Sequence, residues 1–224
     1  MIIRVMTLHV LLIFSTVYAQ SAFGAIETNE MDTEVEEQCG ISMRVPALKN
    51  IYNQELTFDC AGSYREGRKA VLSMDFQYDP NRNSGADLIS FVIENIGIEQ
   101  KIRSGKNSIF HQSEKSDMPS LSAGASYSGS DCEPVTKTII SAIQGRNWHG
   151  WIAEEKFGRR RMDCKSYKQY TSRYRCIHLM IGNEVATAQV GGVCLLRKRE
   201  LSLERGFSYD LFIDMLKSAR FLNQ

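Results

Sequence analysis

The residues best suited to chemistry lie in one short stretch of the chain. Cys176 and His178 are two residues apart, so an extended backbone would put a thiol and an imidazole on the same face of a strand. Together with Cys164 they would offer three ligands of the kind that zinc prefers. In an oxidising compartment the same residues are expected to give a disulfide and a packed histidine, and we favour this interpretation. We therefore predict neither a metal nor another cofactor.

Sequence signatures of the common enzyme classes are missing from the chain. It contains no G-x-S-x-G, H-E-x-x-H, C-x-x-C, Walker or G-x-G-x-x-G motif. An enzyme that uses scattered carboxylates, such as Asp75 and Glu154, leaves no local signature and stays an alternative. We predict a protein that is not an enzyme and that works by binding.

A cationic and aromatic segment at residues 159–175 is the clearest candidate for binding a protein partner. Its cations and tyrosines are opposed there only by Asp163. Arg and Tyr are enriched in protein interfaces, and a rigid hairpin that carries them would bind with little ordering cost. A solvated hairpin tip is the alternative. The residues of this segment that we predict to bind a partner are Arg159, Arg160, Arg161, Tyr167, Tyr170, Arg173 and Tyr174.

Both tryptophans of the chain lie in a second candidate segment, which begins at Arg146. In a strand, Trp148 and Trp151 point to opposite faces unless a bulge at Gly150 intervenes. One of them is then a candidate for exposure beside Arg146, a composition typical of an interface hot spot. Burial of both is the alternative. We include Arg146, Trp148 and Trp151 among the predicted partner-binding residues.

The first 19 residues have the features of a signal peptide. A basic start at Arg4 precedes an apolar run from Val10 to Val17, and small residues end at Ala19. An N-terminal anchor helix is the alternative. Removing these residues leaves 26 basic and 26 acidic residues, a balance that favours neither nucleic acid nor a membrane surface as partner. We predict a periplasmic protein with no membrane span after cleavage.

The cysteine count agrees with export. An even number of cysteines in an exported chain is expected to pair, here as three disulfides. Local geometry favours Cys39 with Cys60 and Cys164 with Cys176, which leaves Cys132 with Cys194. The sequential alternative pairs Cys132 with Cys164 and Cys176 with Cys194. All six lie beyond the predicted signal peptide: Cys39, Cys60, Cys132, Cys164, Cys176 and Cys194.

A hairpin and a C-terminal helix are the elements that would position these residues. Two alternating apolar runs between residues 175 and 196 flank Gly182-Asn183, which predicts a two-residue hairpin loop. That register puts Ile181 opposite Glu184. Residues 208–222 follow with apolar side chains at helical spacing and Ser208 at the capping position, so we expect this helix to cover the hairpin.

The remaining pattern predicts one α+β domain. Residues 20–38 are acidic and predict a mobile leader, and residues 39–224 form a single disulfide-bonded domain with an irregular insertion at 104–134. We expect a mostly antiparallel sheet with two packed helices in a layered sandwich. Strands are predicted at Ile41–Val45, Leu56–Cys60 (antiparallel to the first), Ala70–Tyr78, Thr136–Ile143, Trp148–Phe157 and Tyr174–Ile181, with a second helix from Ser84 to Ile96 that Gly97 ends.

The order of elements resembles the PsbP-like α/β/α sandwich of small exported proteins. The resemblance rests on residues 39–46, a strand that runs into Pro46, and on residues 212–221, a helix followed by Ser-x-Arg-aromatic. These two segments, with residues 145–151, are also similar to periplasmic immunity proteins that neutralise lipase effectors of type VI secretion. This resemblance implies an inhibitor that occludes a toxin, without catalytic residues. An envelope accessory or carrier protein that holds a small apolar ligand is the alternative.

Overall fold

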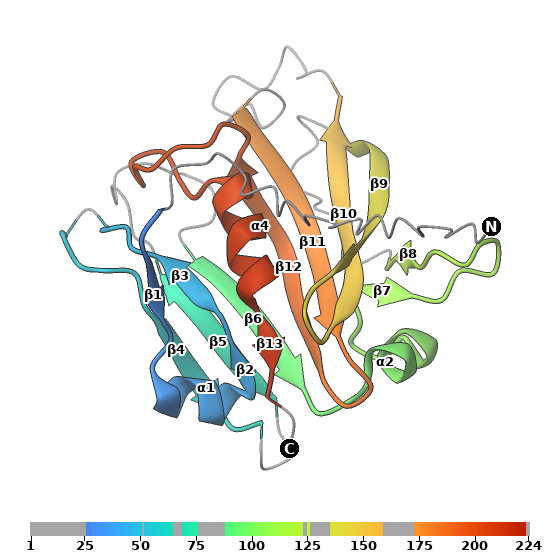
Figure 1. The fold of residues 1–224 in the computed structure, drawn as a ribbon. Helices are drawn as coiled ribbons and strands as arrows, with labels where there is room; N and C mark the ends of the chain where they lie inside the picture. Colours follow the sequence, from blue (N-terminus) through green and yellow to red (C-terminus); the bar gives the residue numbers. More distant parts are fainter. Residues whose placement is uncertain are drawn as a thin grey trace, which may run out of the picture.

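A seven-stranded antiparallel sheet forms the centre of the structure (Figure 1). The structure is a computed structural model that describes residues 26–50, 52–64, 69–75, 88–122, 125, 135–158 and 173–222. The strand order is β4-β5-β6-β12-β11-β10-β9. The strands are β4 (Phe58–Gly62), β5 (Ala70–Asp75), β6 (Leu88–Glu94), β9 (Val135–Gln144), β10 (His149–Phe157), β11 (Tyr174–Gly182) and β12 (Thr187–Leu196).

Helices and short strand pairs cover this sheet. One face carries α4, with α1 and the β1–β3 pair beside it, and α2 with the β7–β8 pair lies at the other end of the molecule (Figure 1). Their bounds are β1 (Thr28–Glu30), α1 (Thr33–Cys39), β2 (Ile41–Ser42), β3 (Arg44–Pro46), α2 (Ile98–Ser104), β7 (Phe110–His111), β8 (Ser120–Leu121), α4 (Tyr209–Ser218) and β13 (Arg220–Phe221), which pairs with β2. The predicted α+β class and the mostly antiparallel sheet are confirmed.

The main core lies between α4 and the sheet. Its buried helix residues include Phe212, which stacks on Phe91 of β6 with ring centroids 6.2 Å apart. The predicted apolar stripe of this helix is therefore confirmed. Ser208 occupies the N-cap position, but its hydroxyl makes no hydrogen bond. A second, smaller core holds α2 and the β7–β8 pair against Ala153 and Met180, on the opposite face.

Four predicted strands are confirmed where the structure describes them: β9, β10, β11 and β5. In β5, Leu72 and Met74 are buried and Asp75 is exposed, as expected for a strand with one face in the core. Residues 76–78 lie outside the described residues.

The predicted helix from Ser84 to Ile96 is wrong, because residues 88–94 form strand β6. Ile89, Phe91 and Ile93 are fully buried at a spacing of two, and β-branched and aromatic residues favour that extended conformation. The apolar residues of this segment are also spaced as in a helix, because some of the outward-facing positions of the strand are apolar. Gly97, which we expected to end a helix, instead precedes α2 as its N-cap.

The expectation of a mobile acidic leader does not hold for residues 26–38. Asp32 caps α1 by accepting a hydrogen bond from the Glu34 N–H at 2.8 Å, and Met31 is buried. Acidic side chains in the first turn interact favourably with the positive end of the helix. Gly40 ends the helix at φ 71°, where a side chain would collide with the ring of Tyr64.

Two further expectations about strand pairing are corrected. The strand that contains Cys60 pairs with β5 instead of Ile41–Val45, because β4 extends the edge of the large sheet. Within the predicted irregular insertion 104–134, the described part contains the β7–β8 pair, which is held in place by the fully buried Phe110. Residues 126–134 lie outside the described residues.

The register of the β11–β12 hairpin also differs from the prediction. Its loop has four residues instead of two, because the Asn183 side chain accepts hydrogen bonds from the N–H groups of Val185 and Ala186, both at 2.9 Å. Ile181 therefore lies opposite Ala188. Further along the pairing of β11 with β12, a bulge in β12 places two glycines opposite His178. Beyond this bulge, Cys176 lies opposite Cys194.

The register of β11 against β12 determines one disulfide bond. Cys176 bonds to Cys194 across the two strands, with a Cα–Cα distance of 3.9 Å. The predicted Cys164–Cys176 and Cys132–Cys194 bridges are therefore wrong, and the Cys39–Cys60 bridge is confirmed. Cys132 and Cys164 lie outside the described residues. Disulfides indicate an oxidising compartment, as is usual for exported proteins.

A buried ion pair fastens α2 to the sheet. Lys101 of α2 is 3% exposed, and its ammonium contacts the carboxylate of Glu94, which Lys69 also approaches at 3.0 Å. Burial raises the pKa of Glu94, but the two lysines outweigh it and the pKa lies below its ordinary value. No helix among the described residues is long and apolar enough to cross a membrane.

The disulfide assignment can be checked directly. Digestion of the non-reduced protein followed by mass spectrometry should yield a linked peptide pair that contains Cys176 and Cys194, and another that contains Cys39 and Cys60. A peptide pair that joins Cys164 to Cys176 would contradict the register of β11 against β12.

The ion pair of α2 gives a second prediction. Glu94→Gln should lower the free energy of unfolding in urea by about 3 kcal/mol, because it leaves the Lys101 ammonium buried without its carboxylate. The double variant Glu94→Gln/Lys101→Met should recover most of that loss. If the double variant is as unstable as the single one, the cost does not come from the uncompensated lysine.

Candidate binding groove and cationic cluster

Three cations surround one carboxylate near the ends of β10, β11 and β12. Glu154 Oε1 lies 3.5 Å from Nε of Arg175 and 3.4 Å from Nη1 of Arg197, and it contacts Lys156 Nζ. The sheet produces this arrangement: Glu154 and Lys156 share a face of β10, and the pairing of Glu154 with Ile177 brings Arg175 close on the next strand. We call Glu154, Lys156, Arg175 and Arg197 the cationic cluster.

The cluster carries more positive than negative charge. Burial raises the pKa of Glu154, but the hydrogen bond from Lys156 and the charges of the two arginines outweigh it, so its pKa is lowered. The carboxylate is therefore ionised at neutral pH, and one negative charge faces three positive ones. About a third of each cation's side chain remains exposed, so the excess charge is accessible to an anionic group.

Tyr209 connects the cluster to helix α4. The Arg175 guanidinium lies 4.3 Å from the centroid of the Tyr209 ring, a distance typical of a cation–π contact. Burial raises the pKa of the Tyr209 hydroxyl. Because Tyr209 is in the first turn of α4, the position of the arginine is tied to the helix that forms the core.

A groove of about 700 Å³ begins at Tyr209 and follows α4 beside the β1–β3 pair. Its rim carries three cations: Arg199 and Lys217 share Asp214 at 2.9 and 3.2 Å, and Arg44 pairs with Glu30 at 2.7 Å. Burial raises the pKa of Asp214, but its two cations outweigh that effect and lower it. We call this the α4 groove. Its apolar walls are formed by Ile26, Pro46, Leu211, Ile213 and Met215.

Only part of the predicted cationic segment can be placed. Arg173 is exposed and lies immediately before β11, two residues from Arg175 of the cluster. Tyr174 is half-buried, and its hydroxyl donates to the carbonyl of Arg205 at 3.4 Å. The other predicted residues lie outside the described part of the chain: Arg159, Arg160, Arg161, Tyr167 and Tyr170.

The two tryptophans point to opposite faces of the sheet, as their spacing indicated. Trp148 is 6% exposed in the main core, and its Nε1 donates to the carbonyl of Ala219 at 2.9 Å, so it could influence a partner only indirectly. Trp151 is half-buried on the other face and Arg146 is exposed. The pairing of β10 with both neighbours is continuous through Gly150, without a bulge there.

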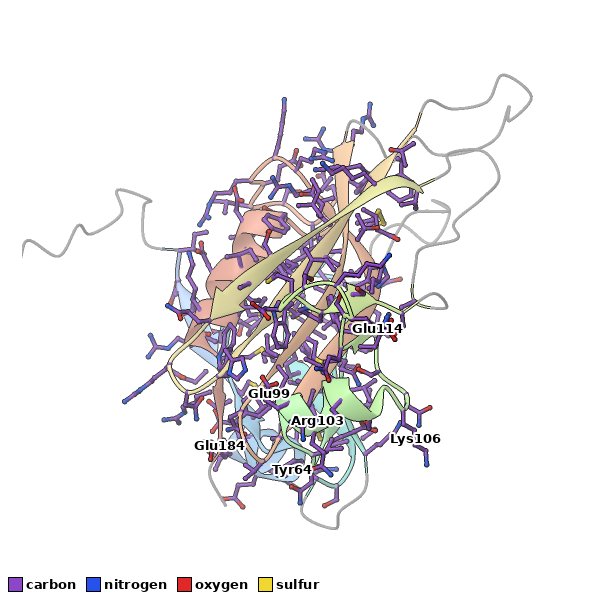
Figure 2. All side chains as sticks on the ribbon, turned by 90° about the vertical axis from the view of Figure 1, so that its right-hand side faces the viewer. Tyr64, Glu99, Arg103, Lys106, Glu114 and Glu184 are labelled. Carbon is purple, nitrogen blue, oxygen red and sulfur yellow. A yellow bond between two sulfur atoms is a disulfide. The ribbon has the colours of Figure 1, made fainter. Side chains whose placement is uncertain are left out.

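Trp151 forms part of a second, polar pocket of about 490 Å³ beside α2. Glu99, Arg103 and Glu114, labelled in Figure 2, line the same pocket. The ring of His149 meets that of Trp151 edge-on at 5.8 Å, and its Nε2 lies 3.3 Å from Glu99. Side chains of both charges line this pocket, and it lacks the apolar walls of the α4 groove.

The structure places Trp151 on the face of the sheet opposite to that of the cationic cluster. Trp151 pairs with Met180, five residues along β11 from Arg175. At about 3.3 Å per residue this is roughly 17 Å, and the Arg175 side chain lies on the other face. Glu154 of the cluster is nearer, three residues from Trp151 along β10.

The thiol of Cys176 and the imidazole of His178 are structural. Cys176 is in its disulfide, and His178 is fully buried with Nε2 3.2 Å from the carboxylate of Glu155, which is buried as well. Its Nδ1 accepts the Gly192 N–H at 3.0 Å, so a neutral ring carries its proton on Nε2. Cys176 is in a disulfide as expected, but with Cys194 instead of Cys164, and the packed histidine is confirmed. The alternative metal ligand Cys164 lies outside the described residues.

Sequence reasoning missed the α4 groove and most of the cluster. Arg197 and Arg199 lie in a short basic run directly after β12, and Tyr209 begins α4. The basic run was a usable signal, but nothing in the local sequence indicates that it meets Glu154 of β10.

Comparison of the chain with protein-family models, curated proteins and solved structures found no match. The resemblance to PsbP-like domains and immunity proteins thus stays an expectation, and the function is inferred from the geometry.

The low pKa of Glu154 predicts the pH dependence of one variant. Ion pairs that lower the pKa of a carboxylate contribute fully to stability when the pH is above the ordinary pKa of 4.5. This contribution is lost as the pH falls through the lower pKa of the folded state. Glu154→Gln should therefore cost about 1 kcal/mol at neutral pH, since solvent screens the pairs, and progressively less in acid. Urea unfolding across pH measures this.

Glu30→Gln is the matched control, because its pair with Arg44 is fully at the surface and should change stability less. If the stability loss caused by Glu154→Gln increased as the pH fell, the ion pairs of Glu154 would not be its cause.

Proposed function

We propose that the protein is an exported, non-enzymatic binding protein that docks onto another protein through the α4 groove and the cationic cluster. The observation that supports this most is their continuity through Tyr209: apolar walls lead directly to a surface with excess positive charge. Such a surface suits an apolar segment flanked by Asp or Glu side chains. The resemblance to immunity proteins suggests an inhibitor that occludes the active site of a secreted toxin.

Rigidity supports a binding role. The groove is built on α4, whose buried face is locked into the main core, and the cations are held by Glu154 and Tyr209. A surface that is already ordered loses little entropy when a partner docks. The disulfides agree with a protein that works outside the cytosol, and we propose the periplasm as its location.

The charge states at this surface favour binding over proton transfer. A general acid or base that works near neutral pH needs a carboxyl whose pKa is raised toward neutrality. The cations around Glu154 and Asp214 lower both pKa values instead. These carboxylates are suited to orienting arginines and lysines for a partner.

The second candidate is a carrier of a small apolar ligand with an anionic end. The volume of the α4 groove, about 700 Å³, lies in the range of small-molecule sites. Arg44, Arg199 and Lys217 at its rim could receive the anionic end. Native mass spectrometry of the purified protein would then detect a co-purifying small molecule, which the inhibitor role does not require.

The inhibitor role is tested by titrating the purified protein with candidate lipase effectors of type VI secretion. Reversing two exposed charges, one beside the cluster and one in the groove, Arg173→Glu/Lys217→Glu, should weaken a complex about 100-fold, because like charges would face the acidic partner. The matched control is Arg103→Glu/Lys106→Glu, which reverses two exposed charges beside α2 and should leave the affinity unchanged. Equal losses in both variants, or none in the first, would contradict this surface.

A further inference from the structure

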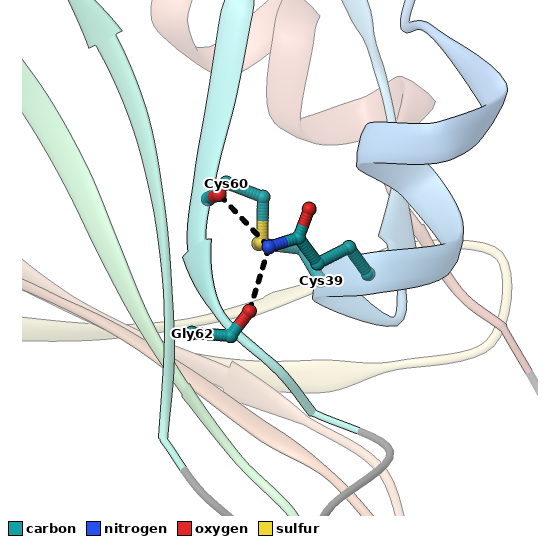
Figure 3. The surroundings of a disulfide bond; sticks show 4 residues. Cys39, Cys60 and Gly62 are labelled. Carbon is teal, nitrogen blue, oxygen red and sulfur yellow. Dashed lines mark hydrogen bonds between the residues drawn. A yellow bond between two sulfur atoms is a disulfide. The ribbon is translucent and has the colours of Figure 1, made fainter.

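The two edge strands of the large sheet, β4 and β9, differ in whether another element covers them. At the β4 edge, the side-chain Nε2 of Gln38 donates to the carbonyls of Cys60 at 3.1 Å and Gly62 at 2.7 Å (Figure 3). The Cys39–Cys60 disulfide fastens α1 against the same strand. Helix α1 therefore occupies the hydrogen-bonding groups that an added strand would need.

The β9 edge has no such cover among the described residues. This strand, faint yellow in Figure 2, is ten residues long and pairs only with β10 there. Its sequence VTKTIISAIQ contains no proline and one charge, Lys137, and Ile139 is 38% exposed. Proteins usually protect edge strands with charges, prolines, bulges or a covering element. The register shift against β10 at Thr136 is confined to the start of β9, so the edge from Lys137 to Gln144 is regular and suited to pairing.

The hydrogen-bond pattern identifies the groups that face outward. The N–H of Gly145 donates to the carbonyl of Trp148 at 2.9 Å, so this pair is a bonded one. Bonded and non-bonded pairs alternate along an antiparallel ladder, which makes Ile143 with Gly150 the next bonded pair. The residues between such pairs direct their N–H and C=O groups to the open edge: Thr138, Ile140, Ala142 and Gln144.

We propose that β9 pairs with β9 of a second copy of this chain, antiparallel about a two-fold axis at Ser141. The sheet then continues from one molecule into the other. Twofold symmetry is the commonest arrangement of homo-oligomers, and it requires a surface that is complementary to itself.

The sequence of β9 meets that requirement. In this register Ile139 lies opposite Ile143 of the second copy on one face, and Ile140 lies opposite Ala142 on the other. Thr138 then meets Gln144, so apolar residues meet apolar ones and polar residues meet polar ones. The axis brings two serine hydroxyls together, which can hydrogen-bond to each other.

Charge and the neighbouring registers favour the same axis. Lys137 lies opposite Gly145 of the second copy, so like charges do not meet. An axis at Ile140 would instead put Ile139 against Ser141. The four outward residues pair among themselves in the Ser141 register, and each pair exchanges two hydrogen bonds.

Cysteine trapping tests the register. Residues at the axis form a directly opposed, non-bonded pair with Cα atoms about 4.5 Å apart, so Ser141→Cys should form a disulfide between two copies. The matched control is Ile139→Cys, whose two copies are four residues out of register and roughly 13 Å apart. It should remain uncrosslinked.

Sedimentation of the full chain tests the pairing itself. We expect a dimer at micromolar concentrations that becomes a monomer in Ala142→Pro, which removes only an outward N–H, and in Ile139→Lys. Val185→Lys, at an exposed β-branched residue of the β11–β12 loop, should leave the dimer intact. Thermal melting verifies that each variant is folded.

Several outcomes would overturn the proposal. They are a monomer at all concentrations, a dimer that persists in both edge variants, or crosslinking of Ile139→Cys as readily as Ser141→Cys. Crosslinking of Ser141→Cys to a different protein alone would also overturn it, since the edge would then accept a foreign strand. None of these outcomes depends on the α4 groove.

Discussion

The packing of α4 against the large sheet is the interaction on which the rest of the structure depends. Phe212 and its buried neighbours on the helix meet Phe91 of β6 and the inward side chains of β11 and β12. Burying a large apolar side chain contributes about 2 kcal/mol, and the helix buries four. The same contact sets the position of Tyr209, and with it the cationic cluster and one wall of the α4 groove.

The opposite face of the sheet shows how the chain handles polar groups that it must bury. The Lys101 side chain is buried beside the carboxylate of Glu94, and His178 lies against Glu155 and the Gly192 backbone. Such groups are costly to bury unless they are paired. The bulge at the two glycines supplies the backbone N–H that His178 accepts and also sets the two cysteines opposite each other. One irregularity in β12 therefore serves two stabilising contacts.

The surface divides into regions with different physical character. The α4 groove combines apolar walls with excess positive charge at one end, whereas the pocket beside Trp151 is polar and mixed in charge. The β4 edge is closed by Gln38 and a disulfide, and the β9 edge is open among the described residues. These differences follow from which elements the chain places beside the sheet.

The Cys39–Cys60 bridge was predicted, but from a hairpin of Ile41–Val45 with Leu56–Cys60 that the structure does not form. The sequence by itself determined the α+β class, the C-terminal helix with its buried stripe, and the strands β5, β9, β10 and β11. These depend on local periodicity or on short loops, which residue types express directly. Only the tertiary structure decided that residues 88–94 form a central strand, that Cys176 bonds to Cys194, and that Arg175, Arg197 and Glu154 meet. The physical reason is that these outcomes depend on strand neighbours and on a bulge, and both are chosen by the burial of the whole sheet beneath α4 and not by any local segment.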